Sequence, residues 1–199
     1  MKLYSMAGSC SSAVHIALRE INRPFELIAV DLRTKLTATG EDFRTINSKG
    51  YVPALLTDAG ALLTEVPAVL QYVADLMPAA GLAPANGTVE RYELQGWLSY
   101  INAELHKDFG PLFDPTATAD MKKYAITKLT RRFGWVAEHL EKSPYLMGDT
   151  FTVADAYLYV VLAWPAMVKL DLSPWPSLSS YRARIADRPA VKAAQAAER

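Results

Sequence analysis

The chain has 199 residues, and its 51% hydrophobic and 21% charged residues are typical of a folded globular protein, not of a disordered or collagen-like one. Lys and Arg number 21, as do Asp and Glu, so the net charge is zero and offers no basic surplus for nucleic acid phosphates. No apolar run approaches the roughly 18–20 residues of a membrane span. We therefore expect a cytoplasmic protein that binds neither nucleic acid nor membrane.

The first part of the chain alternates between strand and helix patterns. Residues 2–6 and 25–30 are candidate strands, and residues 11–21 between them carry apolar side chains at helical spacing. Asn22-Arg23-Pro24 ends that helix. The order predicts a β-α-β unit, in which two parallel strands are joined by a right-handed crossover.

A second group of elements follows a polar stretch that contains at most a short helix at 41–46. Residues 53–57 and 61–64 flank Asp58-Ala59-Gly60, which is suited to a three-residue hairpin loop. Residues 65–77 then repeat apolar side chains at helical spacing before Pro78. The predicted order is thus β-α-β, a short helix, then β-β-α, in a domain of residues 1–80.

The rest of the chain is predicted to be helical. Residues 78–87 are rich in Pro, Gly and Ala, which suits a linker. The segment beyond, 87–199, reads as an all-α domain in which Thr152 and Asp155 form a capping box at a helix start. Three apolar stripes support it: Leu94, Trp97, Leu98, Ile101 and Leu105; Ile126, Leu129, Phe133, Val136 and Leu140; Tyr157, Val160, Val161 and Trp164. The fold class is therefore α/β plus all-α.

Cys10 is the one cysteine, so the chain cannot form an internal disulfide, and the three histidines do not complete a zinc pattern with it. It lies in a Gly-containing loop directly before a helix, where backbone N–H groups and the helix dipole stabilise a thiolate. Cys10-Ser11-Ser12-Ala13 resembles a Cys-x-x-Cys motif without its second cysteine. The alternative is a buried, inert thiol, and position alone leaves both open.

Four further residues have both a functional and a structural interpretation. A cis bond before Pro53 would expose the backbone of the preceding residue to a peptide-like ligand, but a structural turn is the commoner reason for such a proline. Glu65 opens a helix and could pair with an ammonium group, or could simply be a favourable first-turn acid. His106 could be a cation near a helix C-terminus or a donor to a substrate. Lys35 could hold a carboxylate or be a solvated surface lysine.

Together these segments resemble the glutathione S-transferases, and closely the bacterial beta class. The resemblance covers essentially the whole chain in order and spacing, through residues 9–11, 25–34, 47–53, 63–65, 83–87, 104–107 and 151–157. It implies a thioredoxin-like N-terminal domain that binds glutathione and an all-helical C-terminal domain for a hydrophobic electrophile and for dimerisation. It implies a cytoplasmic homodimeric detoxification enzyme with glutathione as co-substrate and no metal.

The resemblance also assigns site residues. Cys10 would face the glutathione sulfur and could form a mixed disulfide with it, with Ser11 as a hydroxyl donor. Glutathione would further contact the following residues: Val52 before a cis Pro53 at its cysteinyl backbone; Glu65 and Val66 at its γ-glutamyl group; Lys35 at its glycine carboxylate; and Ser99, Ala103, Glu104, Leu105 and His106, partly across the dimer.

Three positions depart from the family pattern. Val66 stands where a small or hydroxyl residue is frequent, so a side-chain hydrogen bond to the γ-glutamyl carboxylate is lost; Ser5 and Ser99 stand where close relatives carry Tyr and Asn. Three functions remain in contention. They are conjugation by a glutathione thiolate; thiol–disulfide exchange, peroxide reduction or reductive dehalogenation through a Cys10–glutathione mixed disulfide; and a non-enzymatic binding module.

Overall fold

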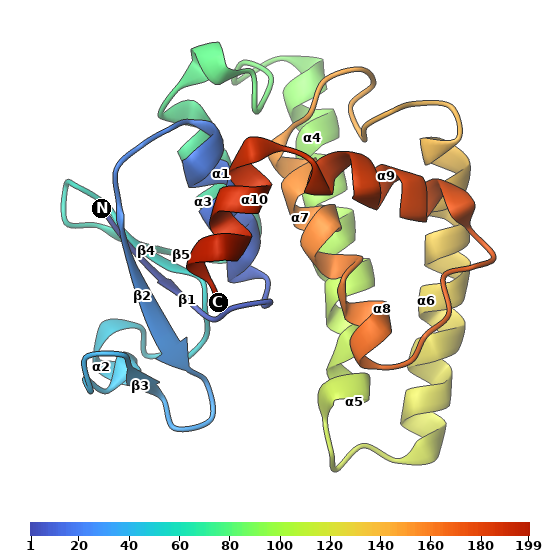
Figure 1. Ribbon diagram of the computed structural model, residues 1–199, viewed down its shortest axis with the longest axis horizontal. Helices are drawn as coiled ribbons and strands as arrows, with labels where there is room; N and C mark the ends of the chain where they lie inside the picture. The colour runs from blue at the N-terminus through green and yellow to red at the C-terminus, as the bar shows by residue number, and fades with distance from the viewer. The chain divides into compact units, whose positions relative to one another are not determined.

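The computed structural model describes residues 1–199 and divides them into two compact units. Unit 1 consists of Met1–Leu82 together with Arg188–Arg199, and unit 2 consists of Ala83–Asp187. Figure 1 shows the strands gathered in the first unit and the long helices in the second. The predicted helical domain of residues 87–199 included the C-terminal segment, which the structure instead assigns to unit 1.

Unit 1 is built on a five-stranded mixed sheet in the order β3-β2-β1-β4-β5. β1 is parallel to β2, and β4 is antiparallel to both β1 and β5, so the predicted β-α-β unit and hairpin are confirmed. β3 was not expected, because it is only two residues long and lies in a polar stretch. The strands are β1 (Lys2–Ser5), β2 (Glu26–Asp31), β3 (Leu36–Thr37), β4 (Ala54–Leu56) and β5 (Leu62–Thr64).

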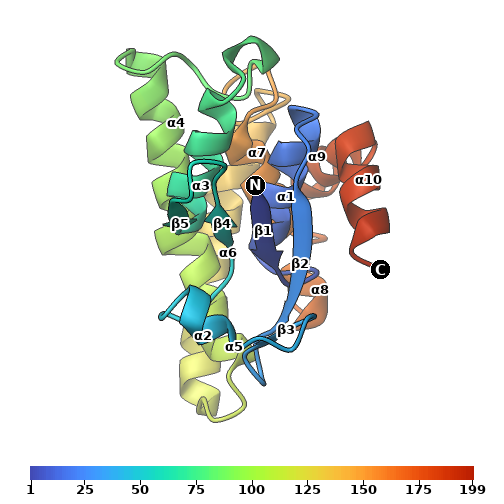
Figure 2. The ribbon, with the colours of Figure 1, turned by 90° about the vertical axis from the view of Figure 1, so that its left-hand side faces the viewer.

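Helices cover both faces of this sheet. α1 (Ser11–Glu20) and α3 (Val66–Asp75) lie on one face, and the short α2 (Phe43–Ile46) lies on the other, as Figures 1 and 2 show from two sides. A single 3-10 turn, η1 (Pro78–Ala80), ends the region. On the α2 side the core is a cluster of apolar residues from the sheet and from α2: Tyr4, Ile28, Val30, Phe43, Val52 and Ala54.

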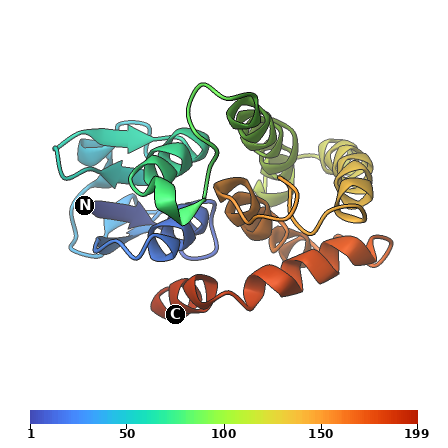
Figure 3. The same ribbon diagram turned by 90° about the horizontal axis from the view of Figure 1, so that it is seen from above.

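The C-terminal helix α10 (Pro189–Ala197) packs along α1, which explains its place in unit 1 (Figure 3). Glu198 accepts hydrogen bonds from the Ser12 hydroxyl at 2.7 Å and from His15 Nδ1 at 2.8 Å. Arg188 forms an ion pair with Glu20, with Nε 2.6 Å from Oε1. These partners lie far away in sequence, so helical periodicity alone could not assign α10 to the first unit.

Unit 2 is all-helical. The predicted first helix, with its stripe ending at Leu105, changes from α to π geometry after Tyr100, and π segments are frequent at functional sites. Ile126, predicted to lie on an apolar stripe, is exposed. No helix combines the length and apolarity that crossing a bilayer requires. The elements are α4 (Val89–Tyr100), the π-helix η2 (Ile101–His106), η3 (Lys107–Phe109), α5 (Gly110–Phe113), α6 (Ala119–Leu140), α7 (Val153–Val161), α8 (Trp164–Met167) and α9 (Pro176–Ala186).

The predicted capping box stands at the start of α7, a helix buried along its whole length. Asp155 Oδ2 accepts from the Thr152 backbone N–H at 2.8 Å and from its hydroxyl at 2.9 Å. Asp155 Oδ1 accepts from the Leu146 N–H and the Tyr181 hydroxyl, each at 2.9 Å. Asp155 therefore ties the α7 start to the preceding loop and to α9.

We predict that Asp155→Ala lowers the free energy of unfolding by about 3 kcal/mol, because several buried donors lose their acceptor at once. Urea unfolding monitored by circular dichroism measures the change. Asp149→Ala, at an exposed position nearby, is the matched control and should leave the unfolding midpoint unchanged. Equal effects of the two variants would contradict this role.

Candidate active site

Cys10 lies at the N-cap of α1 with helical dihedral angles, and its side chain is 8% exposed. Its Sγ donates to the Val52 carbonyl oxygen at 3.5 Å. The first turn of α1 contains no acidic residue of its own, but the Glu198 carboxylate lies against it and accepts hydrogen bonds from the Ser12 hydroxyl at 2.7 Å and the Gly8 N–H at 3.4 Å. The predicted position of the thiol at a helix N-terminus is thus correct, and a negative sulfur would be stabilised there.

The hydroxyl of Ser11 is enclosed beside Cys10. It lies 2.7 Å from the Ser5 hydroxyl and 2.7 Å from the Ser9 hydroxyl, and it donates to the Met6 carbonyl at 3.3 Å. Its side chain is fully buried. The structure therefore places Ser11 where it fixes the loop before α1, and Ser9 is the more accessible of the two hydroxyls.

The segment before β4 contains the cis peptide bond between Val52 and Pro53 that the family resemblance implied. Lys35 contacts this segment. Its Nζ donates to the Gly50 carbonyl at 3.0 Å and lies 5.1 Å from the centre of the Tyr51 ring. Lys35 is thus a half-buried lysine held against the segment, and not a fully solvated surface residue.

Glu65 is the N-cap of α3 and has a positive φ of 70°, which is uncommon for a residue other than glycine. Its carbonyl accepts from the N–H groups of Ala68 and Val69, while its carboxylate extends into solvent and pairs with Lys49 at 2.6 Å. Val66 begins the helix and its side chain is buried. Such backbone outliers cluster at ligand sites. Whether Glu65 also pairs with a ligand ammonium group stays a prediction.

His106 ends the π-helix and is neutral at pH 7. Burial, with a smaller effect from Lys107, lowers the pKa of its imidazole to about 4. Its Nδ1 is 2.6 Å from the Tyr157 hydroxyl, which itself donates to Asn102 Oδ1 at 3.1 Å. With the Tyr157 hydroxyl proton on Asn102, the matching His106 tautomer carries its proton on Nδ1 and has Nε2 as an acceptor. The lowered pKa argues against a cation at this position, and a contact of His106 with glutathione or a second substrate stays a prediction.

The other residues predicted in unit 2 differ in accessibility. Ser99 and Ala103 are exposed on α4 and the π-helix. Glu104 forms an ion pair with Arg132, which also donates to the Glu104 carbonyl at 2.8 Å. Leu105 is fully buried, so its side chain belongs to the core. For these four residues a ligand contact stays a prediction.

The structure brings the unit 1 candidates together around one short segment, residues 49–52. Lys49 contacts Glu65, Gly50 contacts Lys35, and Val52 contacts Cys10. Sequence reasoning missed Lys49, although the predicted hairpin brings its region close to Glu65. It also missed Tyr157 and Asn102 beside His106, for which the sequence holds no local signal. No group of three or more His, Cys, Asp or Glu residues is arranged to hold a metal ion.

A thioredoxin-like sheet with a helix-capping cysteine beside a cis-proline segment, together with an all-helical unit, defines a class of thiol-handling proteins. Residues 7–76 match the family model described as glutathione S-transferase, N-terminal domain, and residues 95–189 match the C-terminal domain model. The chain therefore belongs to the glutathione S-transferase family.

Individual relatives agree over nearly complete lengths. Glutathione S-transferase GstA of Escherichia coli O157:H7 is 42% identical over 100% of this chain and 98% of its own. Two solved structures are each 47% identical, with a TM-score of 0.97 and the same two coverages. They are a sphingomonad glutathione S-transferase complexed with glutathione and a bacterial beta class enzyme of Sphingomonas chungbukensis. The predicted family, fold class and transferase class are confirmed, with glutathione as co-substrate.

We predict that the buried neutral His106 makes stability fall as the pH is lowered. The unfolded chain takes up the proton near pH 6.5 and the folded chain only near pH 4, so the unfolded state binds more protons between these values. Between pH 7.5 and pH 5 the free energy of unfolding should lose up to about 2 kcal/mol from this residue. Urea unfolding of the wild type and His106→Asn at both pH values measures it. The same pH dependence in both proteins would contradict the prediction.

Proposed function

We propose that the protein binds glutathione along residues 49–52 of unit 1 and joins the glutathione sulfur to a hydrophobic electrophile, so that the whole glutathionyl group is transferred. One observation carries this proposal: the segment contacts a carboxylate through Lys49, a lysine through Gly50 and a thiol through Val52. A tripeptide with an ammonium group at one end, a carboxylate at the other and a sulfur between them has matching groups. Glu65 and Val66 would hold the γ-glutamyl group, Val52 the cysteinyl backbone and Lys35 the glycine carboxylate.

The chemistry requires a thiolate near neutral pH, where a free thiol of pKa about 8.5 is only a few per cent ionised. The N-terminus of α1 stabilises negative charge beside Cys10, so glutathione sulfur placed there ionises more readily. Its proton goes to solvent water. The thiolate forms a carbon–sulfur bond with the electrophile, and the leaving group departs with the electrons of the broken bond.

An aromatic cluster in unit 2 supports a hydrophobic second substrate. His106 and Trp164 have ring centres 4.8 Å apart, and Trp164 lies 5.4 Å from Phe109 and 5.8 Å from Phe113. Phe113 is exposed, so part of this cluster remains open to an incoming ligand. The unprotonated Nε2 of His106 would accept a hydrogen bond from that ligand.

Thiol exchange is a second candidate function, favoured by the geometry of Cys10 itself. The sulfur lies at a helix N-terminus, and the chain has no second cysteine to resolve a mixed disulfide with glutathione. Attack of the Cys10 thiolate on a glutathione disulfide would form that adduct and release one glutathione thiolate. A second glutathione would then be needed to regenerate Cys10.

We predict glutathione-dependent conjugation of a chloronitrobenzene well above the uncatalysed rate, and binding of glutathione in calorimetric titration. Cys10→Ser should change the conjugation rate by less than about threefold, because the transferred sulfur belongs to glutathione. The same variant should lose disulfide reduction and any glutathione adduct in the intact mass. Without glutathione binding at millimolar concentration, only a non-enzymatic module would remain. Equal loss of both activities in Cys10→Ser would argue against two separate chemistries.

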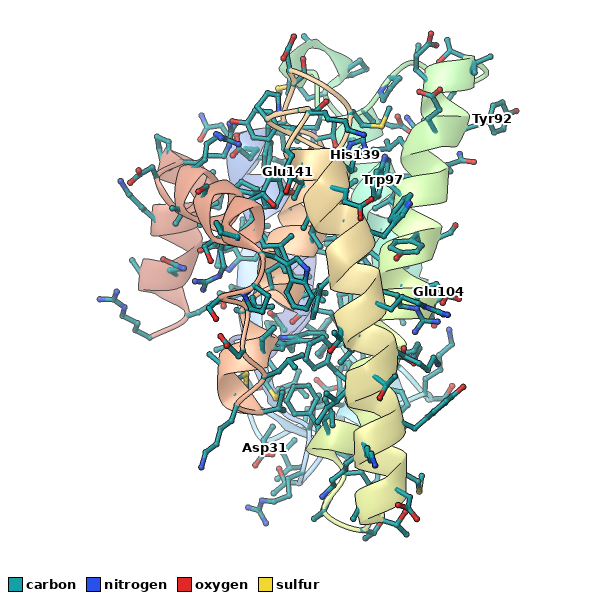
Figure 4. The ribbon with its side chains drawn as sticks, turned by 90° about the vertical axis from the view of Figure 1, so that its right-hand side faces the viewer. Asp31, Tyr92, Trp97, Glu104, His139 and Glu141 are labelled. Carbon is teal, nitrogen blue, oxygen red and sulfur yellow. The ribbon has the colours of Figure 1, made fainter.

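We also propose that the protein is a homodimer that associates through an aromatic patch on α4 and α6, formed by Trp97, Tyr100 and Trp135. The Trp135 ring centre is 5.2 Å from that of Trp97 and 4.9 Å from that of Tyr100, yet Trp135 is 51% exposed. Figure 4 shows Trp97 and His139 between these helices, with Tyr92 extending outward from α4. Exposed apolar patches of this kind mark protein interfaces.

We predict that Trp135→Glu shifts the protein toward the monomer, because a carboxylate in a buried interface would lose its hydration. Sedimentation velocity over a range of protein concentrations measures the dissociation constant, which should rise at least about tenfold. Met167→Glu, at an exposed position on α8, is the matched control. A dimer of unchanged affinity in Trp135→Glu would place the interface elsewhere.

We propose a cytoplasmic location, which accords with a chain that has one free thiol and uses glutathione.

A further inference from the structure

Lys49 and Glu65 present opposite charges side by side at the start of α3. Lys49 Nζ lies 2.6 Å from Glu65 Oε1 and 3.1 Å from the Thr64 hydroxyl oxygen. The two side chains are 52% and 60% exposed. The pairing of Ala54 with Thr64 in the hairpin brings the segment before β4 alongside Glu65, which accounts for the contact across 16 residues of sequence.

We infer that Lys49 is a specificity residue of this site. When glutathione binds, Lys49 separates from Glu65 and pairs with the α-carboxylate of the γ-glutamyl group, while Glu65 pairs with the ammonium group of the same ligand group. The inference rests on the proposed binding of glutathione and adds to it a residue and a ligand group. In the free protein the pair is closed. A zwitterionic amino acid head group offers one charge of each sign, so it can replace the internal ion pair by two pairs with the protein.

The residues around Val66 offer few groups that could bind the α-carboxylate of the ligand, so a cation is needed there. Its side chain carries no hydroxyl group for the ligand carboxylate. Pro67 has no N–H group, and the N–H groups of Ala68 and Val69 are both bonded to the Glu65 carbonyl. The start of α3 can therefore offer the carboxylate at most the Val66 N–H. An ammonium group on a flexible side chain next to it supplies the missing charge.

The exchange of partners requires little free energy. Exposed ion pairs contribute little to stability, so opening the Lys49–Glu65 pair costs little. Both groups keep their charge throughout, and no proton is transferred. Each retains a charged partner after the exchange. The arrangement selects ligands with both charges over ligands with one.

The test combines protein variants with ligand analogues in calorimetric titrations. The ligands are glutathione, its analogue without the α-carboxylate (γ-aminobutyryl-cysteinyl-glycine) and its analogue without the amine (glutaryl-cysteinyl-glycine). The wild type should bind glutathione about tenfold more tightly than the decarboxylated analogue. Lys49→Met should bind these two ligands with affinities equal within about twofold, and Lys49→Arg should restore the preference. Glu65→Gln should instead lose the preference over the deaminated analogue.

The control is Lys2→Met, which removes the lysine of another exposed ion pair of unit 1, Lys2–Glu26, and should keep both preferences. Two results would overturn the inference. In one, Lys49→Met weakens glutathione and the decarboxylated analogue by the same factor; in the other, it strengthens glutathione binding, because Lys49 then only blocks Glu65. Failure of the wild type to bind glutathione at all would instead refute the proposed function.

Discussion

The contact between the Cys10 sulfhydryl and the Val52 carbonyl joins two segments that are 42 residues apart in sequence. One is the loop that leads into α1, and the other is the segment before β4. Their strands, β1 and β4, are neighbours in the sheet, so the sheet order fixes the contact. Two other candidate residues of unit 1 contact the same segment, residues 49–52: Lys35 through Gly50 and Glu65 through Lys49. The enclosed hydroxyls of Ser5 and Ser11 hold the loop before α1 in position.

Within unit 1, the buried sulfur and the exposed charged side chains of the candidate site lie at different positions. The sulfur is almost fully buried at a helix terminus that favours a negative charge, whereas the carboxylate of Glu65 and the ammonium group of Lys49 remain in water. A buried thiol is protected from non-specific reaction. The exposed charges can change partners at low cost. One end of the site is thus suited to chemistry and the other to recognition.

Unit 2 contributes a different environment. His106 is neutral because burial opposes its protonation, and aromatic rings surround it. A neutral imidazole in apolar surroundings can accept one hydrogen bond without adding charge, which suits a hydrophobic electrophile better than an imidazolium would. The buried start of α7, held by Asp155, fixes the helix that carries Tyr157, and Tyr157 in turn fixes the His106 ring. The capping box therefore supports the position of a candidate site residue.

Local pattern in the sequence was enough to predict the β-α-β unit, the hairpin, the capping box at Thr152 and the thiol at a helix N-terminus. Each of these depends on residues close together in the chain, where spacing and turn chemistry act directly. The place of α10 beside α1, the neutral state of His106 and the pairing of Lys49 with Glu65 were decided by tertiary structure. Burial, and contacts between residues far apart in the chain, set these properties, and neither exists until the sheet and helices have packed.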